Sequence, residues 1–186
     1  MRKIILSADS TCDLGEDLKN RYAVNTLPLH VILGEKEYKD GVDISAQDIY
    51  TAYENHNILP KTAAINVNEY IDYFKKWVDE GYSVIHFSIA ASLSSSHQNC
   101  CIAAKELGNV YPIDSCNLSS GIALQILEAA EMIEKGMDVQ DILSEIEKNK
   151  TKVHASFVLD TLEFLHAGGR CSALAALGAN ILNIKP

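Results

Sequence analysis

The sequence is short of positive charge and has no long hydrophobic run. It has 16 Lys and Arg against 25 Asp and Glu, a formal net charge of −9 over 186 residues. Nucleic acids and anionic membranes are bound mainly through clustered basic residues, so this balance argues against both as partners. No run approaches the roughly 18 apolar residues of a membrane span. The start, MRKIILSADS, has too few apolar residues for a signal sequence. We therefore expect a cytoplasmic protein.

Cofactor signatures are also absent from the sequence. The five cysteines form an odd set without C-x-x-C spacing, which is typical of reduced thiols rather than of a disulfide framework. The six histidines are scattered, whereas a zinc site needs Cys and His at ligand spacing. Neither G-x-G-x-x-G nor G-x-x-x-x-G-K occurs. We expect no metal, no nucleotide and no other cofactor.

Short apolar runs alternate with amphipathic segments along most of the chain. The runs at 4–6, 84–87 and 109–113 predict buried strands, and the alternation over 27–33 predicts another. Ser45, Asn66 and Asp138 are typical helix starts, and Glu69 completes a capping box with Asn66. This β-α order predicts an α/β fold, a mostly parallel sheet with helices on both faces.

The pattern changes after Lys150. Alternate residues from Val153 to Leu159 are apolar, as in a sheet with one buried face, and a short helix is expected around 162–166. The apolar stretch 174–184 follows. We therefore expect an α/β domain over 1–150. Residues 151–186 are too few for an ordinary domain, so we interpret them as the start of a second α/β domain.

Three of the predicted strands run into small, oxygen-bearing residues. The three pairs that follow them are Asp9-Ser10, Ser94-Ser95 and Asp114-Ser115. Ligands of parallel sheets bind at the carboxyl ends of the strands, and hydroxyls with helix amides there suit an anionic group. The same residue types also cap helices, which is the competing explanation for any single one.

Two further interpretations of candidate site residues stay open. A Ser-His-Asp triad can be drawn from Ser94, His97 and Asp114, although nothing like G-x-S-x-G surrounds Ser94. Arg170 follows Gly168-Gly169 and precedes an expected helix. It either holds a carboxylate or phosphate, or it is a solvated side chain after a glycine helix stop.

Several motifs together resemble the DegV family of bacterial lipid-binding proteins. The segment Leu93–Gln98 is similar to the family's LSGTYQ, and Val110–Ser115 is similar to its strand-Asp-Ser segment. The other matching segments are Asp9–Leu14, Leu27-Pro28-Leu29, Tyr38-Lys39-Asp40, Leu162–Leu165 ahead of Gly168-Gly169-Arg170, and Ile184-Lys185-Pro186. Their order and spacing over essentially the whole chain carry the resemblance.

The resemblance implies a carrier that is not itself an enzyme and has no catalytic residue. Family members bind one long-chain fatty acid between two α/β domains, and some present its carboxylate to a separate fatty acid kinase subunit. By this resemblance Thr62 and Ser94 would donate hydrogen bonds to the carboxylate, helped by the amide of Ser95. Arg170 would lie near the head group or the kinase docking face. The loops would be supported by Asp9, Ser10, Asp114 and Ser115.

The chain departs from the family pattern at four places. Thr62-Ala63-Ala64-Ile65 replaces TSQP, Ser95 replaces a glycine, His97 replaces a tyrosine, and most of the family's second domain is missing after Pro186. If that glycine has a positive φ, Ser95 strains the loop. We expect a truncated member whose exposed interdomain surface favours self-association. The alternatives are a phosphoryl- or acyl-transfer enzyme that uses Asp9 or Asp114 with a metal, and a truncated scaffold that binds no ligand.

Overall fold

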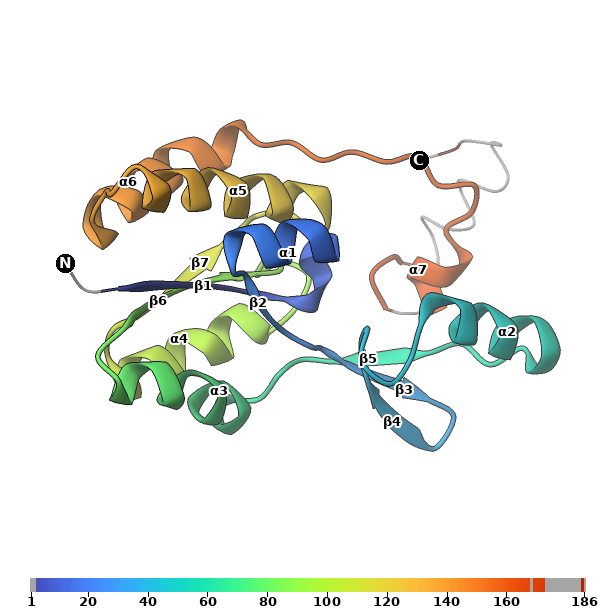
Figure 1. Ribbon diagram of the computed structural model, residues 1–186. Coiled ribbons are helices and arrows are strands. Elements are labelled where there is room, and N and C mark those ends of the chain that lie inside the picture. Colours follow the sequence, from blue (N-terminus) through green and yellow to red (C-terminus); the bar gives the residue numbers. More distant parts are fainter. Residues whose placement is uncertain (1–2, 168, 173–184, 186) are drawn as a thin grey trace. The chain divides into compact units, whose positions relative to one another are not determined.

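Figure 1 shows the computed structural model of the chain, which describes residues 3–167, 169–172 and 185. The contacts divide the chain into two compact units. The first unit consists of Met1–His30 and Ala64–Ala155, and the second of Val31–Ala63 and Ser156–Pro186. The contacts therefore group residues 31–63 with the segment beyond 155. The sequence predicts residues 31–63 as part of a domain that runs to residue 150.

The first unit is built on a four-stranded sheet in the order β2-β1-β6-β7, and every neighbouring pair in it is parallel. This sheet and its helices confirm the predicted α/β class. The strands are β1 (Ile4–Asp9), β2 (Asn25–Leu27), β6 (Ser83–Ser88) and β7 (Val110–Asp114). The helices are η1 (Ser10–Cys12, 3-10), α1 (Glu16–Tyr22), α3 (Val67–Asp79), α4 (Ser96–Leu107), α5 (Ser120–Glu134), α6 (Val139–Asn149) and η2 (Lys150–Lys152, 3-10).

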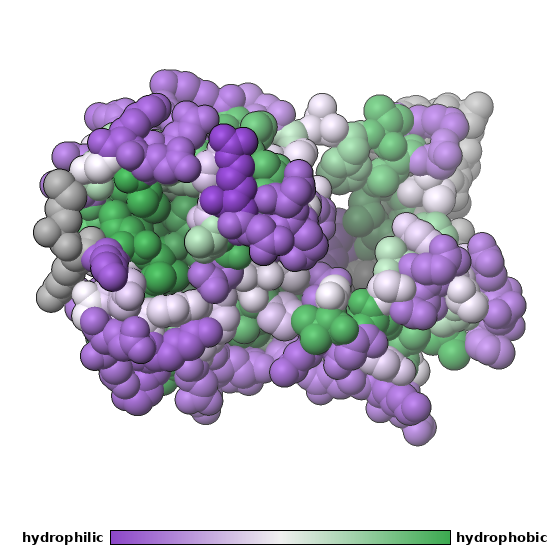
Figure 2. All heavy atoms as spheres, in the orientation of Figure 1, coloured by the Kyte–Doolittle hydropathy of each residue, from purple (hydrophilic) through white to green (hydrophobic). Residues whose placement is uncertain are grey.

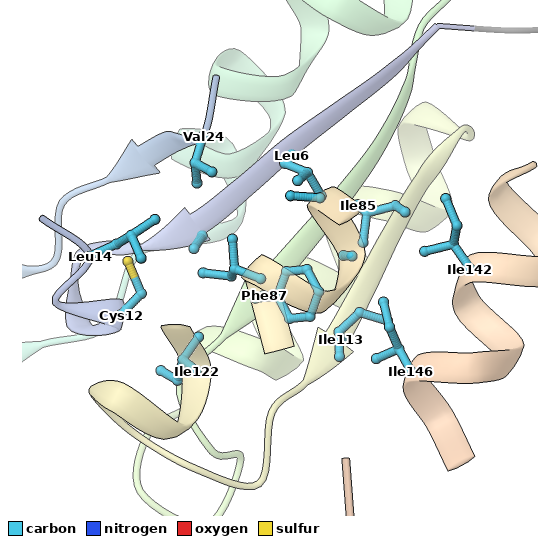
Figure 3. Close-up of a cluster of buried hydrophobic side chains, with 14 of the residues drawn as sticks. Leu6, Cys12, Leu14, Val24, Ile85, Phe87, Ile113, Ile122, Ile142 and Ile146 are labelled. Carbon is cyan, nitrogen blue, oxygen red and sulfur yellow. The ribbon is translucent and has the colours of Figure 1, made fainter. Parts of the chain in front are cut away.

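The sheet of the first unit separates two hydrophobic clusters. On one face, residues of β1 and β6 pack against α5 and α6, and Figure 3 shows Leu6, Phe87, Ile142 and Ile146 converging there. On the other face, the buried residues include Tyr70 and Phe74 of α3 with Cys100, Ala103 and Ala104 of α4. Figure 2 shows hydrophobic residues of this unit between layers of helices whose outer surfaces are hydrophilic. Successive residues of β1 and β6 alternate between these faces, as strand geometry requires.

The helix starts confirm the predicted caps. The side chain of Asn66 accepts a hydrogen bond from the Glu69 amide, and the Glu69 carboxylate accepts one from the Asn66 amide. Ser45 and Asp48 form a second capping box, at the start of α2 (Ala46–His56). The carboxylate of Asp138 accepts from two amides at the start of α6. Each cap satisfies backbone donors that the first helical turn leaves unpaired.

Among the described residues, the second unit has a three-stranded sheet in the order β4-β3-β5 and two helices. Its elements are β3 (His30–Leu33), β4 (Lys36–Lys39), α2 (Ala46–His56), β5 (Lys61–Ala63) and α7 (Glu163–Ala167), and α7 confirms the short helix expected near 162–166. The rings of Tyr53 and Phe164 meet edge to face with their centroids 5.1 Å apart. This contact joins α2 to α7 although more than a hundred residues separate them in the sequence.

Two predicted strands are wrong. The alternation over 27–33 is divided between β2 and β3, which belong to different sheets. Pro28 lies between them and has no N–H for a strand ladder, so alternation alone does not join the two halves. Residues 153–159 form no strand, and Phe157 and Val158 are 60% and 76% exposed. In this segment the alternation has no partner strand among the described residues. The stretch 174–184, Gly168 and Pro186 lie outside the described residues.

We expect Asn66→Ala to lower the free energy of unfolding by about 1 kcal/mol, because the helix loses its side-chain cap. Urea denaturation followed by circular dichroism measures this change. Asn68→Ala is the matched control, since Asn68 is an exposed residue of the same type two positions further on, within the first turn of α3. Equal losses in the two variants would contradict the capping role.

Candidate functional site

The carboxyl ends of three neighbouring strands define the candidate site. Strands β1, β6 and β7 end at Asp9, Ser88 and Asp114, and Ser88 pairs directly with Asp114 in the sheet register. Because the strands are parallel, the segments that follow them begin along one edge, as the sequence predicts. These segments are η1, the loop 89–95 and the loop 115–119.

The fully buried carboxylate of Asp9 lies at the end of β1 and accepts hydrogen bonds from neighbouring segments. Asp9 Oδ1 accepts a hydrogen bond from the Tyr70 hydroxyl at 2.8 Å and lies 3.0 Å from His86 Nε2. Its Oδ2 accepts the Ile89 amide at 3.0 Å. Although Asp9 is the residue before η1, its side chain makes no cap hydrogen bond. The carboxylate therefore holds the start of loop 89–95 and does not cap a helix.

Hydrogen bonds continue from Asp9 deeper into the unit. His86 Nδ1 lies 3.0 Å from the Ser7 hydroxyl, which in turn lies 3.1 Å from the Tyr73 hydroxyl. Burial raises the pKa of Tyr73 to about 12, and it raises the pKa of Tyr70 further above the ordinary value. Both phenols therefore keep their protons at neutral pH. Although Ser7, His86 and Asp9 resemble a catalytic triad in composition, all three are fully buried, so this network is closed to a substrate.

Three successive backbone amides fix the loop that follows β6. The Ile89 amide donates to Asp9, the Ala90 amide to the Asn117 carbonyl at 3.0 Å, and the Ala91 amide to Asp114 Oδ1 at 3.1 Å. The acceptors come from both strands that flank β6, or from the loops that follow them. Asp9 and Asp114 thus accept hydrogen bonds from the backbone of the loop that carries Ser94. Both side chains support this loop.

Ser94 and its neighbours start helix α4. The Ser94 hydroxyl accepts the Ser96 amide at 3.2 Å and lies 3.0 Å from the Ser96 hydroxyl. Ser94 is half-buried, whereas Ser96 has no exposed surface. Ser95 has φ −78° and ψ −1°, an ordinary right-handed conformation, so the strain considered for a residue at the family's glycine position does not arise. The loop accommodates serine at this position.

The polar residues at this edge cap the following helices only in part, since the Ser94 hydroxyl accepts the Ser96 amide at the start of α4. The residues that precede α4 and α5, Ser95 and Ser119, make no side-chain cap hydrogen bond. Three other helices, α2, α3 and α6, are capped by side chains, whereas α1 follows Gly15 and has no side-chain cap. The first amides of α4 and α5 therefore lack the side-chain acceptor from the preceding residue that those three helices have.

Two further predicted residues support the backbone. The Ser10 hydroxyl accepts the Leu29 amide at 3.1 Å. The buried Ser115 hydroxyl donates to the Asn117 carbonyl at 3.0 Å and accepts the Asn117 amide at 3.2 Å. These bonds fix the turns after β1 and β7, so both hydroxyls are used within the protein.

The triad drawn from Ser94, His97 and Asp114 is not assembled. His97 Nε2 lies 3.4 Å from the Cys101 sulfur, while Asp114 accepts amides of the neighbouring loops. Burial lowers the pKa of His97, so its ring is neutral at physiological pH. Within the described ranges we also find no group of three or more His, Cys, Asp or Glu placed to bind a metal ion.

In the second unit, Thr62 and Arg170 lie together. Thr62 is an exposed residue of β5, and Arg170 Nη2 donates to its hydroxyl oxygen at 3.1 Å. The accepted bond leaves the Thr62 proton available for a second acceptor, and the guanidinium supplies positive charge beside it. This pair suits an anionic group.

Sequence reasoning missed three residues of the first unit's site: Tyr70, His86 and Ser96. The sequence does carry a signal for one of them. In β6, His86 and Ser88 occupy alternate positions between apolar residues, and Ser7 and Asp9 do the same in β1. Polar residues on one face of two otherwise apolar strands indicate a buried polar network. Tyr70 is part of an amphipathic helix pattern, where it is indistinguishable from an ordinary core aromatic.

A hollow of about 500 Å³ lies elsewhere in the first unit. It is lined by residues of α1 and β2 between Glu16 and Thr26, and none of the predicted site residues lines it. In the part of the chain that the structure describes, no helix has the length and apolar character to cross a membrane.

Comparisons with known proteins place these features in a family. The model of the DegV family, described as an uncharacterised protein family, matches residues 3–186. A DegV domain-containing protein of Clostridium perfringens is 35% identical over 187 residues, covering 100% of this chain and 67% of its own length. One of Clostridium acetobutylicum is 34% identical with the same coverage. The chain thus spans about two thirds of these relatives.

Solved structures agree with this assignment. A DegV family protein from Thermus thermophilus, described by its fatty acid binding, has a TM-score of 0.87 and 31% identity, covering 100% of this chain and 66% of its own. A stearic acid-binding protein from Eubacterium ventriosum has a TM-score of 0.82 and 29% identity, covering 97% of this chain and 64% of its own. From the sequence match over nearly its whole length and from this shared fold, the chain belongs to the DegV family.

Proposed function

We propose that this chain binds a long-chain fatty acid through its carboxylate and acts as a carrier rather than as a catalyst. The observation that carries the proposal is the Ser94 hydroxyl, half-buried at the carboxyl edge and held by a backbone amide. Related proteins of the same fold from Thermus thermophilus and Bacillus subtilis are described as binding fatty acids. In the first unit the proposed donors are the Ser94 hydroxyl and the Ser95 amide, and in the second unit the proposed donor is the Thr62 hydroxyl.

Neutral donors suit this ligand for a physical reason. A carboxylate needs hydrogen bonds wherever it leaves water, and hydroxyl and amide donors supply them without burying a second full charge. The apolar tail contributes most of the binding free energy, at about 0.8 kcal/mol for each buried CH₂. The head-group site therefore fixes orientation more than total affinity.

The proposal includes delivery of the carboxylate to an enzyme. A carrier that fixes the head group in a polar, loop-built site can present it to a separate kinase subunit, which would transfer a phosphoryl group from ATP to the carboxylate. The triad residues, which have other partners, support the assignment of chemistry to a partner rather than to this chain.

We expect Ser94→Ala and Thr62→Ala each to weaken oleate binding by about 1–2 kcal/mol, or roughly five- to thirtyfold, since each removes one hydrogen bond to a charged group. Isothermal titration of delipidated protein measures the affinity. Ser92→Ala, an exposed serine of the same loop, is the control. Unchanged affinity in either variant would remove that residue from the site, and absence of oleate binding by the parent chain would favour a scaffold without ligand.

We expect Arg170→Ala to weaken oleate binding several-fold, with a smaller effect at high salt, because a guanidinium beside Thr62 attracts the carboxylate. Titrations at two ionic strengths test this. Lys61→Ala is the control, as it removes an exposed positive charge one residue from Thr62 on the same strand. If Arg170→Ala binds oleate normally but supports less acyl phosphate formation with a kinase subunit, Arg170 belongs to the docking face instead.

A further inference from the structure

The chain passes between its two units three times, after residues 30, 63 and 155. Within the first unit, a polar side chain holds the backbone next to each of these passages. The Ser10 hydroxyl accepts the Leu29 amide at 3.1 Å, and the Asn99 side chain donates to the Ile65 carbonyl at 2.8 Å. Asn117 holds the backbone at the third passage. The three side chains belong to segments that follow β1, β6 and β7, at the edge where the candidate site lies.

The side chain and the backbone of Asn117 bind different parts of the first unit. Nδ2 donates to the Ser115 and Val153 carbonyls, both at 3.1 Å, and Oδ1 accepts the Ala155 amide at 3.3 Å. The backbone carbonyl accepts the Ala90 amide at 3.0 Å. Both N–H donors and the acceptor of the side-chain amide are therefore used. Asn117 thus joins the loop that follows β6 to the last residues of the first unit.

The start of α5 leaves room for this side chain. A Cβ atom added at Gly121 would lie 2.5 Å from Asn117 Oδ1 and 2.7 Å from its Cγ, closer than such atoms approach in proteins. Gly121 does not have a positive φ, so its backbone conformation does not require glycine. Glycine is also a poor helix former. The lack of a side chain at this position therefore serves the placement of Asn117.

We propose that Asn117 is a positioning residue that couples the loop carrying Ser94 to residues 153–155, so that fatty acid binding at Ser94 also restrains the third passage. The inference rests on the proposed function of Ser94. A ligand that restrains this loop restrains Asn117 through the bond between the Ala90 amide and the Asn117 carbonyl. The side chain of Asn117 extends the restraint to the segment before the passage.

The coupling acts in both directions, because two linked equilibria change each other by the same factor. When the side chain of Asn117 holds residues 153–155, the turn after β7 is in place before the ligand arrives. Less ordering then remains to be done on binding, and the affinity is higher. In a carrier, occupancy of the head-group site would in turn change the order of the backbone where the chain leaves the first unit.

The Ala155 amide reports this coupling, since Asn117 Oδ1 is its acceptor. Its exchange with solvent is measured by NMR in delipidated protein and at saturating oleate. We expect oleate to slow this exchange about three- to tenfold in the parent chain, the net value of one hydrogen bond. In Asn117→Ala the oleate-dependent difference should vanish, and oleate affinity, measured by isothermal titration, should fall by about three- to tenfold. A residue that only stabilised the fold would lower the unfolding temperature without removing this difference.

Two further variants complete the test. Asn149→Ala is the matched control, because Asn149 is an asparagine on the other side of the same segment, where it forms hydrogen bonds with Glu128 and Lys152. It should change neither the oleate affinity nor the exchange difference. Gly121→Ala displaces the Asn117 side chain without removing it, and we expect it to act as Asn117→Ala does. Thermal unfolding of each variant shows that it folds, and either of the two test variants can make the test alone.

The outcomes separate this inference from the proposed function. If Ser94→Ala weakens oleate binding but Asn117→Ala and Gly121→Ala do not, the positioning role is overturned and the carboxylate site stands. An oleate-dependent difference at Ala155 that persists in Asn117→Ala also overturns it, since the protection would then not pass through Asn117. If Ser94→Ala leaves oleate binding unchanged, the proposed role of Ser94 fails, and this inference fails with it.

Discussion

The burial of the Asp9 carboxylate is the constraint on which the first unit depends. A charge without exposed surface must be fully hydrogen-bonded, since an unpaired buried charge costs several kcal/mol. The donors come from separate parts of the chain: Tyr70 from α3, His86 from β6, and the Ile89 amide from the next loop. A shift of α3 along the sheet would remove the Tyr70 donor, and a shift of β6 in register would displace His86 and the Ile89 amide. One side chain thus links the end of β1 to the helix layer and to the loop that carries Ser94.

The two faces of the sheet consequently have different roles. The face toward α5 and α6 is filled by aliphatic side chains and Phe87, and its stability depends on volume and shape alone. The face toward α3 and α4 carries Ser7, Asp9 and His86 beneath aromatic rings, where direction matters as well as size. Helix α4 also begins at the serines of the candidate site. The face of the sheet that carries the polar network is therefore covered by a helix whose start is partly exposed. Polar chemistry and plain packing are separated by a single layer of strands.

Local patterns explain how much could be predicted from the sequence. The caps at Asn66 and Asp138 follow from interactions within a few residues, and the parallel sheet follows from the alternation of local strand and helix patterns; all of them are present. Asp9 shows the limit of prediction from local patterns, because an aspartate at the end of a strand is equally typical of a helix cap. Only the placement of α3 decides that its side chain points into the protein. The failed strand at 153–159 has a similar cause, since alternation describes one strand and says nothing about its partner. The grouping of 31–63 with 156–186 depends on contacts such as Tyr53 with Phe164, which no local pattern reports.

The energetics of a long apolar ligand give a reason for a head-group site that is built from neutral donors rather than from a buried charge. A chain of about 15 methylenes would contribute roughly 12 kcal/mol if fully buried, before the cost of immobilising it. A strong charged clamp added to that sum would slow release of the ligand. Neutral hydroxyl donors would keep the head-group contribution small and still fix the direction of the carboxylate. In the second unit, the Arg170–Thr62 pair adds charge in an exposed position, where solvent weakens it. A carrier of this design takes its affinity from the tail and its orientation from the head group.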